Sequence, residues 1–141
     1  MYTGLTDKQK LRLSDLKEKT TECGEQLKIA IEEFNSEMRE LFDRIVLTKE
    51  AKLNKSIGKV NDFIAEVVDE ATTERDDLDE DTDSDEFERI TAFIDTYSSS
   101  EMEEISIDSP DDLSEELPDD YVNGIECLNE LPETVDDSEQ G

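Results

Sequence analysis

Apolar residues recur at alternating steps of three and four along the first third of the chain. This spacing is typical of a helix with a heptad seam. The helix is expected to begin after Thr6, a suitable N-cap, because Gln9 stands three residues later and completes a capping box. The seam contains Leu13, Leu16, Thr20, Cys23, Leu27, Ala30 and Phe34. It continues in a shifted phase, as a stutter produces, through Ile31, Phe34, Met38, Leu41 and Ile45.

A third apolar run is the most regular, and it contains Leu53, Ile57, Val60, Ile64, Val67 and Ala71. No proline precedes Pro110, so two arrangements are open. Residues 6–74 form either one helix of roughly 100 Å or a hairpin that folds back near 46–49, with Thr48 as the cap of its second helix. An amphipathic stripe needs a partner surface. We therefore expect a homo-oligomer, a dimer, that associates through Leu16, Leu27, Phe34, Met38, Leu41, Ile45, Leu53, Ile57, Val60, Ile64 and Val67.

The remainder reads as short elements. Residues 74–85 (ERDDLDEDTDSD) are so acidic that like-charge repulsion predicts a loop or a frayed helix end. Helical spacing returns at Phe87, Ile90, Ile94 and Tyr97. Further on we expect alternation at Ile105 and Ile107, one helical turn from Ser109 and Pro110, and a short helix over 118–131 that ends at Pro132. The predicted fold is all-α, with a helical region 1–73, an acidic linker 74–86, an acidic region with short helices 87–131 and a disordered tail 132–141.

Charge divides the chain into two unequal parts. The net charge is −28, yet residues 1–60 hold 12 basic and 11 acidic side chains. Residues 61–141 hold only Arg75 and Arg89 against 31 acidic side chains. The sequence thus predicts two electrostatic objects joined end to end.

Enzymatic chemistry finds little support in the residues. The chain has no histidine, no Gly-rich phosphate loop and no nucleophile with a recognisable base. Residues 61–141 hold many carboxylates and few apolar residues, so these carboxylates cannot all be buried deeply enough to shift their pKa values as acid–base catalysis requires. We therefore expect a non-enzymatic protein without a cofactor. Cys23 and Cys127 are each expected to be small buried hydrophobes, and two distant thiols with no apolar run of membrane length favour a cytoplasmic protein.

One acidic stretch has the ligand spacing of an EF-hand calcium loop. Its positions 1, 3, 5, 7, 9 and 12 are Asp77, Asp79, Asp81, Asp83, Asp85 and Glu88. However, Thr82 stands where the sharp turn requires glycine, and Ser84 where an apolar anchor is usual. We therefore expect weak, diffuse cation binding in preference to a specific metal site.

The density of negative charge suggests imitation of nucleic acid. If residues 69–88 are helical, they carry about one net charge per 2.7 Å, between the values for one DNA strand and for the duplex. Apolar residues persist among the acids, which favours a foldable interaction surface, whereas a plain solubilising tail is the alternative. The residues expected to contact a partner are Asp76, Asp77, Asp79, Glu80, Asp81, Asp83, Asp85, Glu86 and Glu88.

Residues 60–97, VNDFIAEVVDEATTERDDLDEDTDSDEFERITAFIDTY, have a long amphipathic helix, an acidic Glu74-Arg75 stretch and a shorter aromatic-bearing helix. This layout resembles small acidic helical proteins of bacteriophages and mobile elements, over about a quarter of the chain. Phe87, Phe93 and Tyr97 stand where that class carries tryptophans. The resemblance implies a host-takeover or anti-defence factor in the cytoplasm of a host cell.

Three functions follow as hypotheses. The first is a nucleic-acid mimic that inhibits a basic DNA- or RNA-binding host protein and does not itself bind nucleic acid or membrane. The second is a coiled-coil assembly factor, scaffold or chaperone with a solubilising acidic tail. The third is a weakly calcium-binding helix pair.

Overall fold

The computed structural model describes residues 2–37, 42–113 and 116–135. These residues form four α-helices and no strand, so the prediction of an all-α fold is confirmed. In chain order the elements are α1 (Asp7–Glu37), the π-helix η2 (Phe42–Val46), α2 (Leu47–Asp76), α3 (Ser84–Ser98), the 3-10 helix η3 (Pro110–Asp112) and α4 (Asp119–Asn129).

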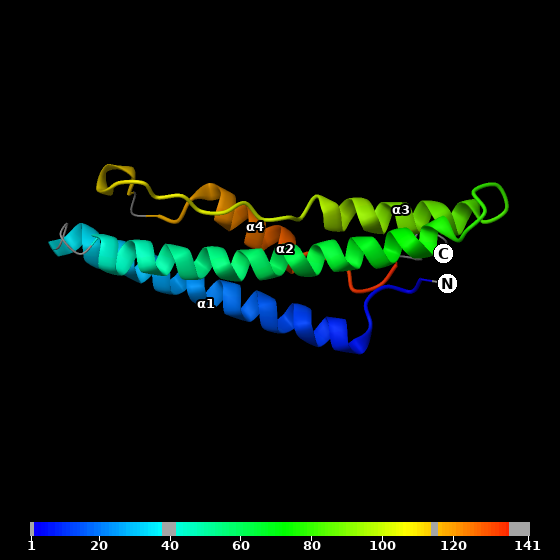
Figure 1. Ribbon diagram of the computed structural model, residues 1–141, viewed down its shortest axis with the longest axis horizontal. Helices are drawn as coiled ribbons and strands as arrows, with labels where there is room; N and C mark the ends of the chain where they lie inside the picture. Colours follow the sequence, from blue (N-terminus) through cyan, green and yellow to red (C-terminus); the bar gives the residue numbers. More distant parts are fainter. Residues whose placement is uncertain (1, 38–41, 114–115, 136–141) are drawn as a thin grey trace.

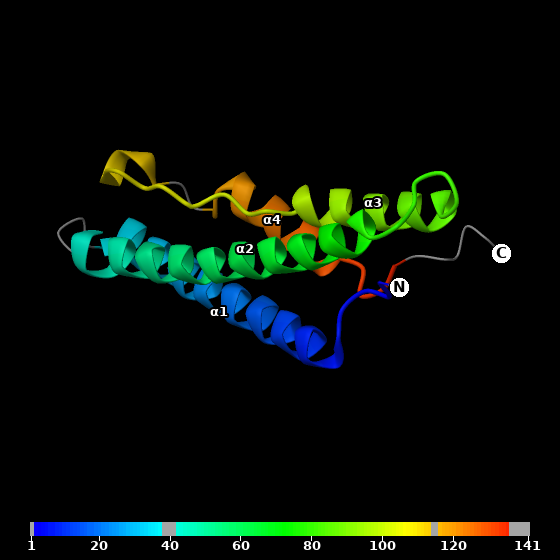
Figure 2. The same ribbon diagram turned by 45° about the vertical axis from the view of Figure 1, so that its right-hand side comes forward.

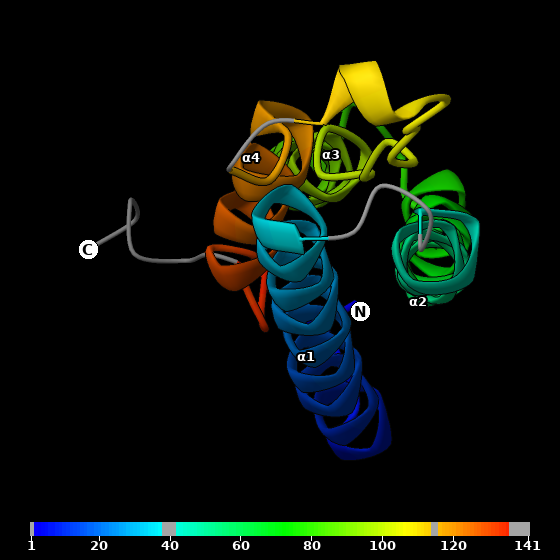
Figure 3. The same ribbon diagram turned by 90° about the vertical axis from the view of Figure 1, so that its left-hand side faces the viewer.

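The two long helices form a hairpin. α1 and α2 run side by side in opposite directions, α3 packs on α2, and α4 packs on α1 (Figures 1, 2 and 3). The single long helix is therefore excluded. α1 ends at Glu37 and the returning helical segment begins at Phe42, so the expected fold-back at 46–49 falls within η2 and α2 and is wrong. Thr48 does not cap α2. The backbone of α2 continues directly from η2, which ends at Val46, so no helix N-terminus lies at Thr48.

α2 is the central helix of the molecule. It packs against α1 on one side and α3 on the other, and its seam residues are completely buried. Thr20 and Ser56 form the polar exception in the interface of α1 with α2, where their buried hydroxyl oxygens lie 2.7 Å apart. A buried apolar core with one satisfied polar pair holds the hairpin together.

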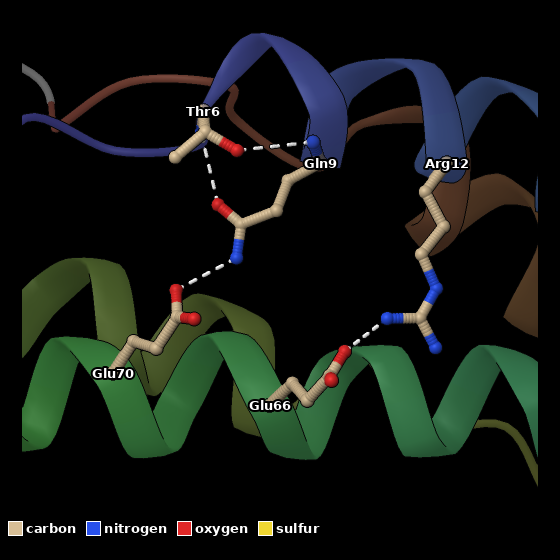
Figure 4. A network of polar contacts seen from close by, with 5 residues as sticks. All are labelled: Thr6, Gln9, Arg12, Glu66 and Glu70. Carbon is tan, nitrogen blue, oxygen red and sulfur yellow. Dashed lines mark hydrogen bonds and ion pairs between the residues drawn. The ribbon is translucent and has the colours of Figure 1, made fainter.

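The first turn of α1 is built as expected from the sequence. The Gln9 main-chain N–H donates to Thr6 Oγ1 at 3.1 Å, and the Thr6 N–H donates to Gln9 Oε1 at 2.9 Å, which is a complete capping box. Figure 4 shows that Gln9 and Arg12 also reach α2. Gln9 donates to Glu70 at 2.7 Å, and Arg12 forms an ion pair with Glu66. The near-neutral and acidic parts of the chain therefore lie side by side, not end to end as the sequence suggested.

A third layer of chain beside α2 consists of α3 and an extended segment that follows it. After α3 the chain continues beside α2 as an extended segment, residues 101–109, and then returns through α4 (Figure 1). Ile105 and Ile107 are buried, as their alternation predicted, together with Met102. The expected turn at Pro110 and the expected short helix before Pro132 are both present.

The two ends of the described chain are paired. Gly4 bridges Thr134, and the Leu5 N–H donates to the Glu133 carbonyl oxygen at 2.8 Å. Gly4 has a φ of 108°, a conformation that favours glycine. The Tyr97 hydroxyl donates to the Pro132 carbonyl oxygen at 2.7 Å. The prediction of disorder is thus wrong for residues 132–135, and the rest of that predicted tail, 136–141, lies outside the described residues.

The two cysteines differ in their surroundings. Cys23 is buried in the seam, as expected, whereas Cys127 is exposed. α4 buries Tyr121 and Leu128, which are seven residues apart and share one face, and Cys127 falls on a different face. In the described part of the chain, no helix has the length and apolar character needed to span a membrane.

Candidate electrostatic binding site

The connection between α2 and α3 carries most of the predicted contact residues. α2 ends at Asp76, residues 77–83 reverse the chain, and α3 begins at Ser84. The exposed carboxylates here, called the acidic tip below, are Asp76, Asp77, Asp79, Glu80, Asp81, Asp83, Asp85 and Glu88. Because the chain reverses, residues 69–88 are not one helix, and the estimate of linear charge spacing is wrong. The charge gathers at the end of a helical hairpin.

Two carboxylates shape the turn itself. Asp79 Oδ1 accepts the main-chain N–H groups of Asp81 at 2.9 Å and Thr82 at 3.4 Å, and Asp83 Oδ2 accepts the Asp79 N–H at 3.2 Å. The hydrogen bonds to Asp79 favour its charged form and lower its pKa, although the side chain is exposed. Asp79 and Asp83 thus hold the turn through its main-chain N–H groups.

Glu86 is the one predicted contact residue that the structure removes from the site. Its side chain is buried and forms an ion pair with Arg89 one helical turn further on. Burial of an ionised carboxylate requires such a partner. Glu86 therefore belongs to the packing of α3, and the prediction that it contacts a partner is wrong.

A shallow depression of about 470 Å³ lies beside the tip along α3. Its lining includes four carboxylates, a phenylalanine ring and small polar side chains, namely Glu80, Asp81, Ser84, Phe87, Glu88, Thr91, Ala92 and Asp95. Arg75 lies over the Phe87 ring at 5.5 Å and donates to Thr91 Oγ1 at 3.2 Å. Thr91 and Asp95 were not among the predicted contact residues, although both follow Phe87 at helical spacing. Because Arg75 of the chain itself lies over the Phe87 ring, the four carboxylates are the groups that suit a guanidinium or ammonium group.

The calcium-loop spacing does not produce a calcium-loop geometry. Asp79 and Asp83 bond the main chain of their own turn. Among the described residues, no three acidic, cysteine or histidine side chains come together as metal ligands. The missing glycine at Thr82 is consistent with this different turn.

The described residues that were predicted to mediate self-association are buried in, or packed against, the core of a single chain. Leu16, Leu27 and Phe34 are buried in α1, Ile45 is partly buried in η2, and Met38 and Leu41 lie outside the described residues. The α2 members are fully buried, and these are Leu53, Ile57, Val60, Ile64 and Val67. Self-association stays a prediction, and in this fold it requires another surface.

Comparison with protein-family models, with curated proteins and with solved structures finds no match to this chain.

Proposed function

We propose that this is a non-enzymatic binding protein that captures a basic, nucleic-acid-binding protein and blocks its nucleic-acid groove. The observation that carries the proposal is the acidic tip, eight exposed carboxylates at one end of a helical hairpin. Such a surface attracts a basic groove over long range and forms charge-assisted hydrogen bonds on contact. The resemblance to acidic proteins of bacteriophages gives a context in which the captured protein belongs to a host.

The packing of α1 against α2 favours this function over a coiled-coil scaffold. A scaffold needs an apolar seam for a second chain, and the seam of this chain is filled by its own helices. The depression beside the tip supports capture of individual side chains, since its four carboxylates match an arginine or lysine of the partner.

Point substitutions test the proposal better than truncation, because α3 packs on α2 and its removal would expose the core. We would neutralise Asp77, Glu80, Asp81 and Glu88 to Asn or Gln and leave Asp79 and Asp83 to hold the turn. The matched control neutralises four exposed carboxylates of α1, Asp15, Glu18, Glu22 and Glu33. Both variants lose the same charge, so only position distinguishes them.

The assay is displacement of labelled duplex DNA from a basic nuclease, polymerase or chromatin protein across a salt series. The wild-type protein and the α1 variant should displace DNA at low salt and lose this effect as salt rises. The tip variant should be weaker by about tenfold or more, since each exposed charge pair contributes up to about 1 kcal/mol. Equal displacement by both variants, or none by the wild type at low salt, would refute the proposal.

A further inference from the structure

Two asparagines of α2 hold the main chain of the extended segment 101–109. Asn61 Oδ1 accepts the Met102 N–H at 2.8 Å, and Asn61 Nδ2 donates to the Met102 carbonyl oxygen at 2.8 Å. Asn54 makes the same pair of hydrogen bonds with Ile105, both at 2.7 Å. Each side-chain amide thus replaces the residue that a neighbouring β-strand would supply.

A carboxylate extends this series by one step. Glu50 Oε2 accepts the Ile107 N–H at 2.6 Å. From Asn61 to Glu50 the helix advances about 16 Å at ~1.5 Å per residue, and from Met102 to Ile107 an extended chain advances about 16 Å at ~3.3 Å per residue. The helix and the antiparallel segment therefore stay in register over all three contacts.

These contacts recognise a chain conformation and not a particular set of polar side chains. All five hydrogen bonds go to main-chain atoms of the segment. Only Met102, Ile105 and Ile107 are buried, and Gly124 of α4 lies close to Met102, since a Cβ there would be 3.0 Å from its methyl carbon. The groove beside α2, with α4 close to Met102, thus selects an extended chain with apolar residues at the positions of Met102, Ile105 and Ile107, the second, fifth and seventh of the segment.

One charge contact opposes the place of the segment in this groove, that of Asp108 with Glu50. The exposed side chains of the segment include four carboxylates, Glu101, Glu103, Glu104 and Asp108, on a molecule of net charge −28. Glu50 adds a fifth carboxylate, and burial raises its pKa, with a smaller contribution in the same direction from the charge of Asp108. An extended chain with basic residues at the outward positions would keep every main-chain contact and relieve this repulsion.

We propose that the groove formed by Asn54, Asn61 and Glu50 is a docking site for an extended segment of a basic partner protein, which displaces residues 101–109. The partner segment carries apolar side chains at the positions that correspond to Met102, Ile105 and Ile107, and lysine or arginine between them. This surface is separate from the acidic tip, and either site can fail without the other.

A labelled peptide tests the proposal with the intact protein. The peptide has the sequence of residues 100–110 with Glu101, Glu103, Glu104 and Asp108 replaced by lysine, and fluorescence anisotropy follows its binding. A second peptide differs only by an N-methyl group on the main-chain nitrogen that corresponds to Ile105. We expect the first peptide to bind and the second to bind about tenfold more weakly, because one hydrogen bond is lost and its acceptor is left unpaired. Failure of the first peptide to bind, or equal binding of the two, overturns the proposal.

Protein variants identify the surface that binds. Asn54→Leu removes the same hydrogen bonds from the peptide and from residues 101–109, so it should abolish the effect of N-methylation at the position of Ile105. Asn61→Leu, and neutralisation of Asp77, Glu80, Asp81 and Glu88, should leave that effect unchanged. The reverse pattern assigns the peptide to the acidic tip and overturns the groove proposal alone. Circular dichroism shows whether the asparagine variants fold, and if they do not, the N-methyl comparison on the wild-type protein decides.

Discussion

Gly24 of α1 lies directly against Tyr121 of α4, so closely that a Cβ at Gly24 would be 1.9 Å from the tyrosine hydroxyl oxygen. The hydroxyl passes over the glycine and donates to the Thr20 carbonyl oxygen at 3.2 Å. Tyr121 is the point at which the C-terminal helix reaches the seam of the hairpin. A glycine in the middle of a long helix, which normally lowers helix stability, is here required by packing.

Gly24→Ala should therefore destabilise the protein by about 1–3 kcal/mol, the usual cost of overpacking a core. Gly58→Ala is the matched control, because Gly58 also lies inside a long helix and has nothing within 4 Å of an added Cβ. Alanine there should stabilise by about 0.5–1 kcal/mol through helix propensity. Urea unfolding measures both changes, and effects of the same sign would contradict the close approach of Tyr121.

The buried pair of Thr20 and Ser56 makes a second prediction, about stability. Thr20→Val leaves the Ser56 hydroxyl without its partner in the core and should cost about 1–3 kcal/mol. Thr20→Val together with Ser56→Ala removes both polar groups, so the double variant should regain much of that loss. Thr21→Val, at the exposed neighbouring position, should change stability by less than about 0.5 kcal/mol. Strictly additive effects of the two core substitutions would show that the hydroxyls do not interact.

Local signals in the sequence were sufficient for much of the fold. The capping box of Thr6 and Gln9, the apolar face of α3 and the turn at Pro110 each depend on residues a few positions apart, and each is present. Heptad spacing identified the buried seam correctly. It did not identify what covers the seam, because spacing is the same whether the partner is another chain or the next helix.

The misjudged features depend on contacts between distant residues. Glu86 looks like its acidic neighbours in sequence, yet its position on the inner face of α3 pairs it with Arg89. The groove was missed because Asn54 and Asn61 are polar residues beside an apolar stripe, and only the return of residues 101–109 gives their amides a partner. Their spacing of seven residues on one helix face was the available signal.

The three tyrosines give a prediction about alkaline pH. Burial raises the pKa of Tyr2 and of Tyr121 to about 12, and it raises the pKa of Tyr97 further. In the unfolded chain the tyrosine hydroxyls have their ordinary pKa of 10.0. The native protein resists their ionisation, so its free energy of unfolding falls as the pH rises above 10.0. Each buried tyrosine should remove about 1.4 kcal/mol per pH unit until its folded pKa is reached.

Tyrosinate absorbance is a direct measurement, since the chain has three tyrosines and no tryptophan. The tyrosines of the native protein should titrate together with unfolding, well above pH 10, and those of the protein in urea should titrate near 10. Tyr121→Phe should reduce the steepness of the loss of stability above pH 10. Ionisation of all three tyrosines near 10 without loss of helical circular dichroism would contradict their burial.

The acidic tip makes the last prediction, about salt. Its eight carboxylates repel one another, and the Debye length of about 10 Å at 0.1 M salt screens much of this repulsion. Added sodium chloride should therefore raise the melting temperature of the wild-type protein. Neutralisation of Asp77, Glu80, Asp81 and Glu88 should raise it at low salt and weaken its salt dependence. The α1 variant that loses Asp15, Glu18, Glu22 and Glu33 should gain less, because the lysines and the arginine of α1 already offset these charges. Equal gains from the two variants would show that net charge alone, and not the crowding of carboxylates at the turn, sets the electrostatic cost of this fold.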